Sequence, residues 1–171
     1  MGTKFDAAVW NARVWRRFSR TLTSGRRRPT KEEHAWFFDV LAVSDIARLE
    51  DWIKKRGVKL EFTSREPNGK YDHEKKLIVV SSNLRPTRQA VVIVHECGHH
   101  LVDTARGKAL CEPNNFRERV EYIEDEFEAW KRGRNLAIRL ELKMSETDFQ
   151  EYKLECVKTY MKWVVDPKKW E

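Results

Sequence analysis

The sequence is poor in cysteine and has no long apolar segment. Its three cysteines, Cys97, Cys111 and Cys156, supply neither an even disulfide framework nor a Cys-x-x-Cys pair, so we expect reduced thiols. No apolar run approaches the roughly 18 residues that a membrane helix needs, and the N-terminus lacks the apolar region of a secretory signal. These absences predict a protein of the cytoplasm without a membrane-spanning segment.

The chain nevertheless has enough apolar side chains to fold. Hydrophobic residues make up 40% of its 171 positions, with seven Trp and eight Phe, which argues against disorder. Neither internal repeats nor low-complexity tracts occur. Because this length fits one core, we expect a single domain over residues 29–171, preceded by a basic helix and linker over residues 1–28.

Positive charge is concentrated near the start of the chain. Residues 13–31 contain eight cations and no acidic residue, and removing these eight from the net charge of +7 leaves −1 for the remainder. The eight are Arg13, Arg16, Arg17, Arg20, Arg26, Arg27, Arg28 and Lys31. With Trp10 and Trp15 interleaved, this segment could bind nucleic acid or an acidic protein, and a solvated helix face followed by a loop is the alternative.

The most informative segment is residues 95–100, which read His-Glu-Cys-Gly-His-His. On a helix, His95 and His99 lie one turn apart on one face, so both imidazoles can reach a single Zn²⁺. Glu96 then stands beside the metal, where a general base would take a proton from bound water. Apolar residues on both sides predict a buried helix over about residues 86–105, with Pro86 in its first turn and Ser82 or Asn83 as its cap.

Three neighbours of these histidines have predicted places on the same helix. Cys97 points away from the metal face, and His100 is rotated about 100° from His99, which predicts a position on the helix surface. Gly98 lowers helix stability by about 1 kcal/mol relative to Ala, which suggests that another backbone or the substrate passes close to it.

A catalytic zinc usually has three protein ligands, and the third is not a downstream histidine. The five histidines are His34, His73, His95, His99 and His100. We therefore expect a carboxylate from the acidic, helical segment over residues 121–130, where Ala129 is small enough for two helices to approach closely. Glu124, Glu126 and Glu128 are the candidates.

At this point the chain resembles the gluzincin zinc peptidases, most closely the ImmA/IrrE-like metallopeptidases of bacteria and phages. In that group the His-Glu-x-x-His helix is followed by Glu-x-x-Ala, and residues 126–129 match this pattern, so the resemblance implies that Glu126 is the third ligand. The resemblance covers about residues 58–140. Larger gluzincins have Asp four residues after the ligand Glu, where this chain has Trp130, which leaves Asp103 or Asp125 to orient an imidazole.

The remaining pattern predicts an α+β fold, a mainly helical single domain with a small antiparallel sheet packed on the zinc-binding helix. Helices are expected over residues 5–22, from Thr30 through Leu41, and from a cap at Ser44 to an end at Gly57. Strands follow over residues 58–63 and 77–80, then helices over about residues 114–142 and from Ser145 to just before Pro167. In gluzincin-like enzymes an exposed edge strand takes the substrate peptide, and residues 76–82 are the candidate edge.

The leading hypothesis is a zinc-dependent peptidase that hydrolyses peptide bonds of a specific protein partner, with Glu96 as base. Tyr122, Tyr152, Tyr160 or an Arg would stabilise the tetrahedral intermediate. Peptide deformylase is disfavoured because no cysteine precedes the motif to serve as its third ligand. The alternative hypothesis is not an enzyme. It is a phage or mobile-element interaction protein with a structural or vestigial zinc site, which binds an acidic protein or nucleic acid through the basic segment.

Overall fold

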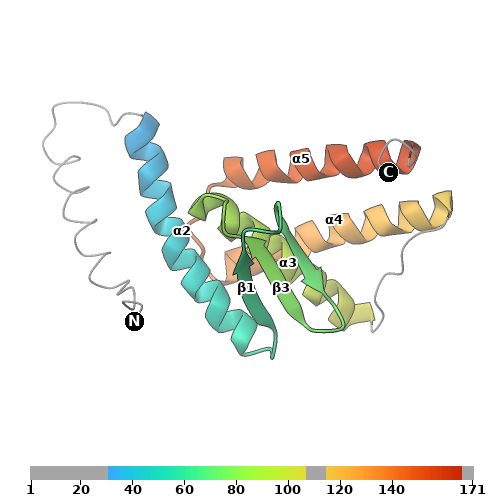
Figure 1. Ribbon diagram of the computed structural model, residues 1–171, viewed down its shortest axis with the longest axis horizontal. Coiled ribbons are helices and arrows are strands. Elements are labelled where there is room, and N and C mark those ends of the chain that lie inside the picture. The colour runs from blue at the N-terminus through green and yellow to red at the C-terminus, as the bar shows by residue number, and fades with distance from the viewer. Residues whose placement is uncertain (1–30, 107–114, 167–171) are drawn as a thin grey trace, which may run out of the picture.

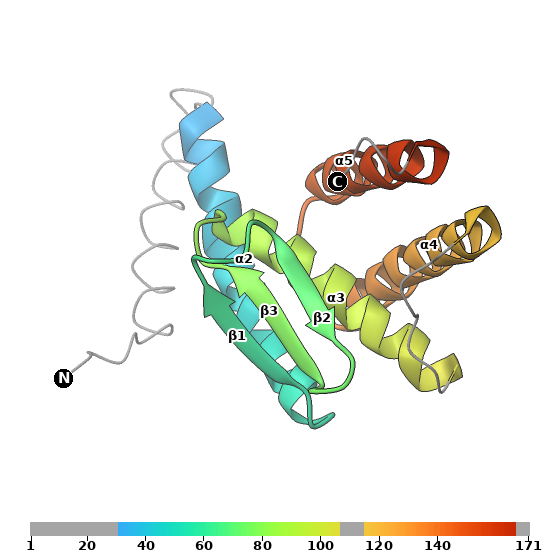
Figure 2. The ribbon, with the colours of Figure 1, turned by 45° about the vertical axis from the view of Figure 1, so that its right-hand side comes forward.

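The structure is a computed structural model that describes residues 31–106 and 115–166. Within these residues the elements are α2 (Lys31–Lys54), β1 (Lys59–Thr63), β2 (Gly69–Asp72), β3 (Leu77–Ser81), α3 (Pro86–Arg106), α4 (Phe116–Arg139) and α5 (Glu146–Val165). The α+β prediction is confirmed: α2 and α3 pack against the sheet, and α4 and α5 lie beyond α3 (Figures 1 and 2). The predicted helix over residues 5–22, the boundary at residue 28 and the basic segment up to Arg28 lie outside the described residues.

The helix α2 corrects one prediction, because it is continuous where the sequence suggested two helices divided before Ser44. No Gly or Pro interrupts residues 31–54, and Val40, Leu49 and Ile53 of this helix are buried. The chain leaves the helix at Gly57, as predicted, with a φ of 69° that suits glycine.

The sheet is mixed, so the prediction of an antiparallel sheet is wrong. Its strand order is β1-β3-β2, with β1 parallel and β2 antiparallel to β3. The short strand β2, which has one large apolar residue, Tyr71, reverses the chain between β1 and β3. Residues 76–82 are therefore not an edge: β3 is the central strand, with Ile78 and Val80 fully buried, and β2 is the edge nearer to α4.

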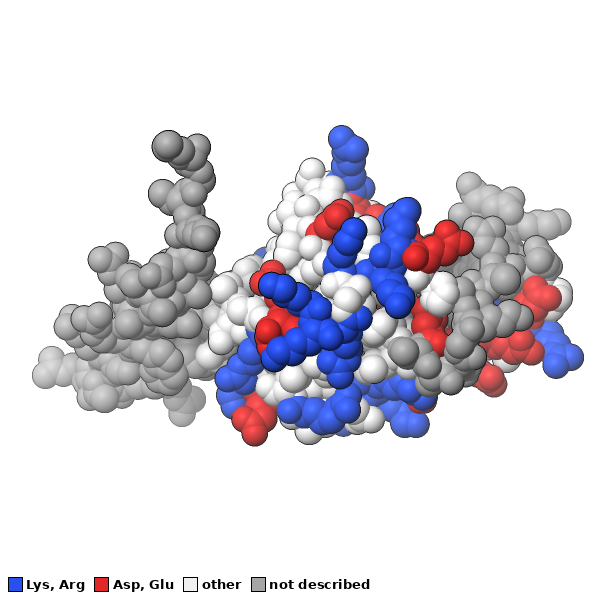
Figure 3. All heavy atoms as spheres, turned by 90° about the horizontal axis from the view of Figure 1, so that it is seen from below, with Lys and Arg blue, Asp and Glu red and all other residues white. Residues whose placement is uncertain are grey.

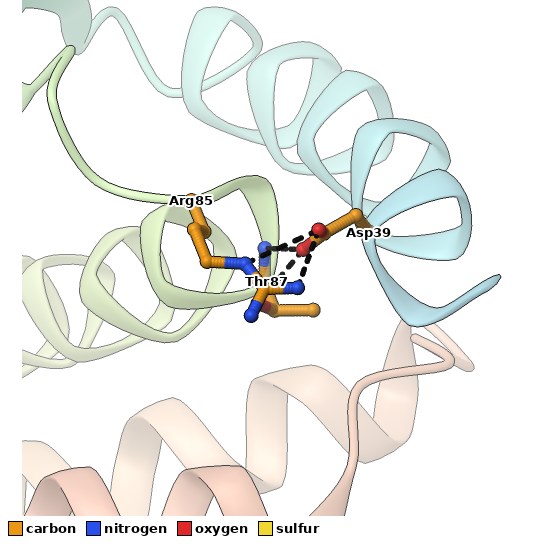
Figure 4. Close-up of polar contacts among 3 residues, drawn as sticks. All are labelled: Asp39, Arg85 and Thr87. Atoms are coloured by element: carbon orange, nitrogen blue, oxygen red, sulfur yellow. Dashed lines mark hydrogen bonds and ion pairs between the residues drawn. The ribbon is translucent and has the colours of Figure 1, made fainter. Parts of the chain in front are cut away.

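The central helix α3 begins at Pro86 and ends at Arg106, which confirms the predicted helix over residues 86–105. Its first turn is capped from α2 and not by Ser82 or Asn83, which corrects that prediction. The Thr87 backbone N–H and hydroxyl both donate to Asp39 Oδ1, at 3.4 and 3.0 Å, and Arg85 Nη2 donates to Asp39 Oδ2 at 2.7 Å (Figure 4). This contact ties α2 to the start of α3.

The helices α3 and α4 cross with their backbones in contact. A Cβ atom on Gly98 would lie 2.0 Å from the carbonyl oxygen of Ala129, and one on Gly133 would lie 2.5 Å from that of Val94. The prediction that Gly98 faces a neighbouring backbone is thus confirmed. This crossing brings the middle of α4 over the His-Glu-x-x-His turn.

The helix α5 runs back along α4 from a cap at Ser145, whose side chain accepts a hydrogen bond from the Asp148 N–H, as predicted. Trp130 of α4 is buried between the two helices, edge-on to the rings of Phe149 and Tyr152. None of the described helices is long and apolar enough to cross a membrane.

Candidate metal centre and active-site cleft

Three potential metal ligands converge where α3 and α4 cross. His95 and His99 come from successive turns of α3, and Glu126 comes from α4 one turn before Ala129. The two Nε2 atoms are 3.2 Å apart, and each lies 3.4 Å from a different oxygen of Glu126. Among the described residues this is the group of His, Cys, Asp and Glu side chains arranged to hold a metal ion.

The donor set and its spacing fit zinc. Two ligand atoms bound at about 2.05 Å in a tetrahedron are separated by about 3.3 Å, which is close to the distance between the two Nε2 atoms and to the distance from each Nε2 atom to the Glu126 oxygen beside it. Two imidazoles and one carboxylate are also a usual catalytic donor set, with one position left for water or substrate. The residues therefore suit a zinc ion without a change in the backbone.

The other two carboxylate candidates lie elsewhere on α4. Glu124 is exposed, and Glu128 accepts hydrogen bonds from Arg132 and Lys131 on the outside of the helix. Neither belongs to the ligand cluster. The geometry thus favours Glu126, the residue that the family pattern implied.

The electrostatics of the cluster show how strongly Glu126 prefers a cation beside it. Burial alone would raise the pKa of this carboxyl, but His95 and His99 hold it well below its usual range. Burial likewise would lower the pKa of His99, but the hydrogen bond and charge of Glu126 outweigh burial and raise it to about 9. A buried carboxylate facing two imidazoles is a site that binds protons or a metal ion tightly.

Aromatic rings contact two of the three candidate ligands. Trp130 stacks on the His95 ring, with centroids 3.9 Å apart and planes 14° from parallel, and His95 Nδ1 has no hydrogen-bond partner among the described residues. The residue that stacks on His95, Trp130, is thus at the sequence position where larger gluzincins have an Asp. Tyr122, one turn before Glu126, is hydrogen-bonded to that carboxylate, and burial followed by the Glu126 charge raises the pKa of its phenol.

Glu96 is held beside the cluster by the edge strand. Its carboxylate is buried at 6% exposure and accepts a hydrogen bond from the Tyr71 backbone N–H in β2. Burial raises its pKa, and His95 and His99 oppose this rise. Gly69 keeps the strand close, because a Cβ there would lie 2.3 Å from Val92 Cγ1 of α3 and 3.7 Å from Glu96 Oε1. A carboxylate with a raised pKa, next to a metal site, suits proton transfer.

A cavity of about 280 Å³ opens beside these groups. It is lined by Gly69, Lys70, Tyr71, His73, His95, Glu96, His99, Asp103, Tyr122, Glu126 and Tyr160. Of the three tyrosines considered as donors to the intermediate, Tyr152 is absent from this lining, since its ring packs against Trp130. A larger cavity of about 520 Å³ lies between α2, α3 and α5, away from the cluster, so size alone does not mark the site.

Two histidines near the cavity have roles that the sequence did not show. His100 is buried, with its Nδ1 3.0 Å from the Tyr71 hydroxyl, so its predicted place on the helix surface is wrong. His73, in the turn after β2, has its Nδ1 2.6 Å from Asp103 Oδ2, so Asp103 orients this histidine and not a motif imidazole. Cys97 packs in the core, away from the cavity, as predicted. Only the three-dimensional fold brings β2 and α3 together.

Comparison with known proteins agrees with this geometry. Searches of curated proteins and of solved structures gave no match. A family profile described as Peptidase M78, IrrE N-terminal-like domain, matches residues 53–162, which include the motif helix and α4. The chain belongs to this family of metallopeptidases.

Proposed function

We propose that the protein is a zinc-dependent peptidase in which His95, His99 and Glu126 hold the metal and Glu96 is the general base. The observation that carries this proposal is that a buried carboxylate and a three-ligand cluster line one cavity. A structural zinc site would be closed by a fourth protein ligand. The cluster among the described residues has three ligands and faces the cavity, which supports a catalytic site.

The chemistry divides between the metal and this chain's carboxylate. A zinc ion in the site would act as a Lewis acid toward water and the substrate carbonyl. Glu96 takes a proton from the attacking water on its carboxylate and returns that proton to the nitrogen of the leaving amine when the C–N bond breaks. Its burial and the Tyr71 N–H keep this carboxylate in place through both transfers.

The substrate backbone would pair with the edge of β2. This strand is bonded to β3 on one side, and its residues Gly69, Lys70 and Tyr71 line the cavity on the other. Strand addition gives affinity through main-chain hydrogen bonds, while side-chain contacts give selectivity. The position of β2 beside Glu96 would bring a paired peptide to the base.

Two cavity-lining side chains are the proposed donors to the tetrahedral intermediate. Tyr160 reaches the cavity from α5, whereas Tyr122 is engaged with Glu126. His73 also lines the cavity and is oriented by Asp103. A donor placed where the oxyanion forms lowers the barrier most when its position is fixed beforehand.

The interaction-protein alternative rests on the basic N-terminal segment. A protein with a vestigial site would have no need to keep a carboxylate buried next to the ligand cluster, since burial of an acid without function costs stability. Peptide hydrolysis is therefore the better reading. We place the protein in the reducing cytoplasm, in keeping with the free thiols of Cys97 and Cys156.

The test compares zinc-loaded wild type with Glu96→Gln on a pool of quenched fluorescent peptides with randomised central residues. Wild type should cleave the pool, and the variant should lose at least a hundredfold in rate while keeping its zinc. Equal rates would remove Glu96 from the mechanism. A zinc-loaded wild type that cleaves nothing would contradict the proposal.

A further inference from the structure

Six exposed cations gather at the end of the sheet beside the cleft. They are Lys54, Lys55, Arg56, Lys59, Lys75 and Lys76, and we refer to them as the basic pole. The topology brings them together, because α2 ends there, β1 begins there and the turn from β2 to β3 closes there. The Lys59 N–H donates to the Lys76 carbonyl at 2.8 Å. Figure 3, which views the molecule from this end, shows Lys and Arg side chains gathered on its surface.

The basic pole keeps a net positive charge after its internal ion pairs are counted. Three acidic residues, Asp51, Asp72 and Glu74, lie among the six cations, so the net charge of this region is +3. Lys55 pairs with Asp51 at 2.7 Å, and Lys75 pairs with Asp72 at 2.9 Å. Lys54, Arg56, Lys59 and Lys76 form no ion pair with another described residue. Outside residues 13–31 the whole chain has a net charge of −1, so the pole stands out against its surroundings.

One residue of the basic pole has a constrained backbone, and another has a constrained side chain. Lys76 has a φ of 47°, a left-handed conformation that is unfavourable for a residue with a Cβ atom. Arg56 is also fixed, because its guanidinium lies 3.8 Å over the Trp52 ring. A guanidinium held in this way loses less entropy when it binds a partner.

The basic pole continues directly from the cleft along β2. Lys70, Tyr71 and His73 line the cavity, and Lys75 and Lys76 are the next cations along the chain. A peptide paired with β2 that extends past His73 would therefore cross the pole. Lys70, whose side chain is 62% exposed, also lines the cavity, and it pairs there with Glu66 at 3.3 Å, so the two together add no net charge.

We propose that the basic pole binds an acidic segment of the substrate protein, next to the bond that is cleaved. This inference rests on the proposed peptidase function and names the class of substrate. Charge complementarity favours an acidic partner. A peptide suits the pole better than a nucleic acid, because a peptide can also pair with the edge strand β2, and because the Trp52 ring is buried beneath Arg56, where no base could stack on it.

The experiment measures binding and cleavage with the same peptides. Two labelled pools share six randomised residues and differ in a flank of four Glu or four Gln, placed before or after the randomised block. Binding to the zinc-loaded Glu96→Gln protein is followed by fluorescence anisotropy at about 50 and 300 mM salt. Cleavage of both pools is followed with zinc-loaded wild type.

Charge-reversal variants are made in the Glu96→Gln background for binding and in wild type for cleavage. Lys59→Glu combined with Lys76→Glu should weaken binding of the Glu pool about tenfold at low salt, since each exposed pair contributes a factor of about two and reversal also adds repulsion. Lys158→Glu combined with Lys162→Glu changes the net charge equally on α5, which does not contact the sheet, and should leave binding unchanged.

The outcomes separate this inference from the proposed function. Preference for the Glu pool that is lost in the pole variant and at high salt supports the assignment. Cleavage without any preference for acidic flanks overturns the assignment and leaves the peptidase proposal standing. Tighter binding of a 20-base-pair DNA duplex, lost in the same variant, also overturns it. Binding of the Glu pool with no cleavage by zinc-loaded wild type contradicts the peptidase function, and with it the role of the acidic segment as substrate, while binding of an acidic peptide at the pole stands.

Discussion

Replacing Gly98 with Ala tests whether the contact between α3 and α4 sets the geometry of the metal centre. The new methyl carbon would start 2.0 Å from the Ala129 carbonyl oxygen and 2.7 Å from its carbon. Both atoms belong to backbone that cannot rotate away. Since nonbonded carbon and oxygen atoms need about 3.2 Å, the helices would have to separate by roughly 1 Å.

Two effects of opposite sign determine the change in stability. Overpacking of this kind costs about 1–3 kcal/mol, and the better helix propensity of Ala offsets about 1 kcal/mol of it. We expect a net loss of about 0–2 kcal/mol in the free energy of unfolding. The separation would also move Glu126 away from His95 and His99, whose nitrogens now lie 3.4 Å from its oxygens. Zinc affinity should therefore fall at least tenfold.

Urea unfolding of the zinc-free protein measures the first effect, and competition with a fluorescent chelator measures the second. Asn135→Ala, an exposed change on α4, is the control and should alter stability by less than about 0.5 kcal/mol. A Gly98→Ala protein that matches wild type in both stability and zinc affinity would refute the close crossing.

Three further predictions concern the surroundings of the ligands. Tyr122→Phe should weaken metal binding about tenfold with little change in fold, because it removes the hydrogen bond to Glu126. Titration with cobalt in competition with a chelator measures the affinity, and an unchanged affinity would contradict this role of Tyr122. Trp130→Ala should destabilise the protein by about 3–5 kcal/mol, as loss of a buried aromatic usually does, and Trp130→Phe by much less; equal urea midpoints for the two variants would contradict the stacking role. In zinc-free protein the pKa of His99 is about 9, above its ordinary 6.5. Protonated His99 therefore contributes fully to the free energy of unfolding below about pH 6.5, and this contribution is lost as the pH rises toward 9. The urea midpoint should fall across that window, and Glu126→Gln should flatten the fall; a midpoint of wild type that rises there would contradict the pairing.

The sequence predicts best where local pattern and chemistry coincide. Apolar periodicity around the motif predicts α3 nearly to its ends, and Ser145 marks the start of α5. The spacing of His95 and His99 on one helix follows from helical geometry alone. Glu126 was reached through the family pattern, since three carboxylates in one helical segment are chemically alike.

Features that depend on distant contacts could not be predicted from local pattern. The strand β2 has too few apolar residues to be recognised, and without it the sheet order and the edge strand are wrongly assigned. The Asp39 cap on α3 joins residues 48 positions apart. The pairing of His73 with Asp103 and the burial of His100 against Tyr71 likewise need the fold, because each joins β2 or its turn to α3.

The zinc content of four proteins after dialysis against a weak chelator tests the central claim most directly. Wild type and Glu124→Ala should each retain about one zinc per chain, because Glu124 is exposed and lies outside the ligand cluster. His99→Ala and Glu126→Ala should retain almost none, since two remaining ligands rarely hold the ion. A wild type that takes up no zinc, or a Glu126→Ala protein that holds zinc as tightly as wild type, would contradict the metal centre described above.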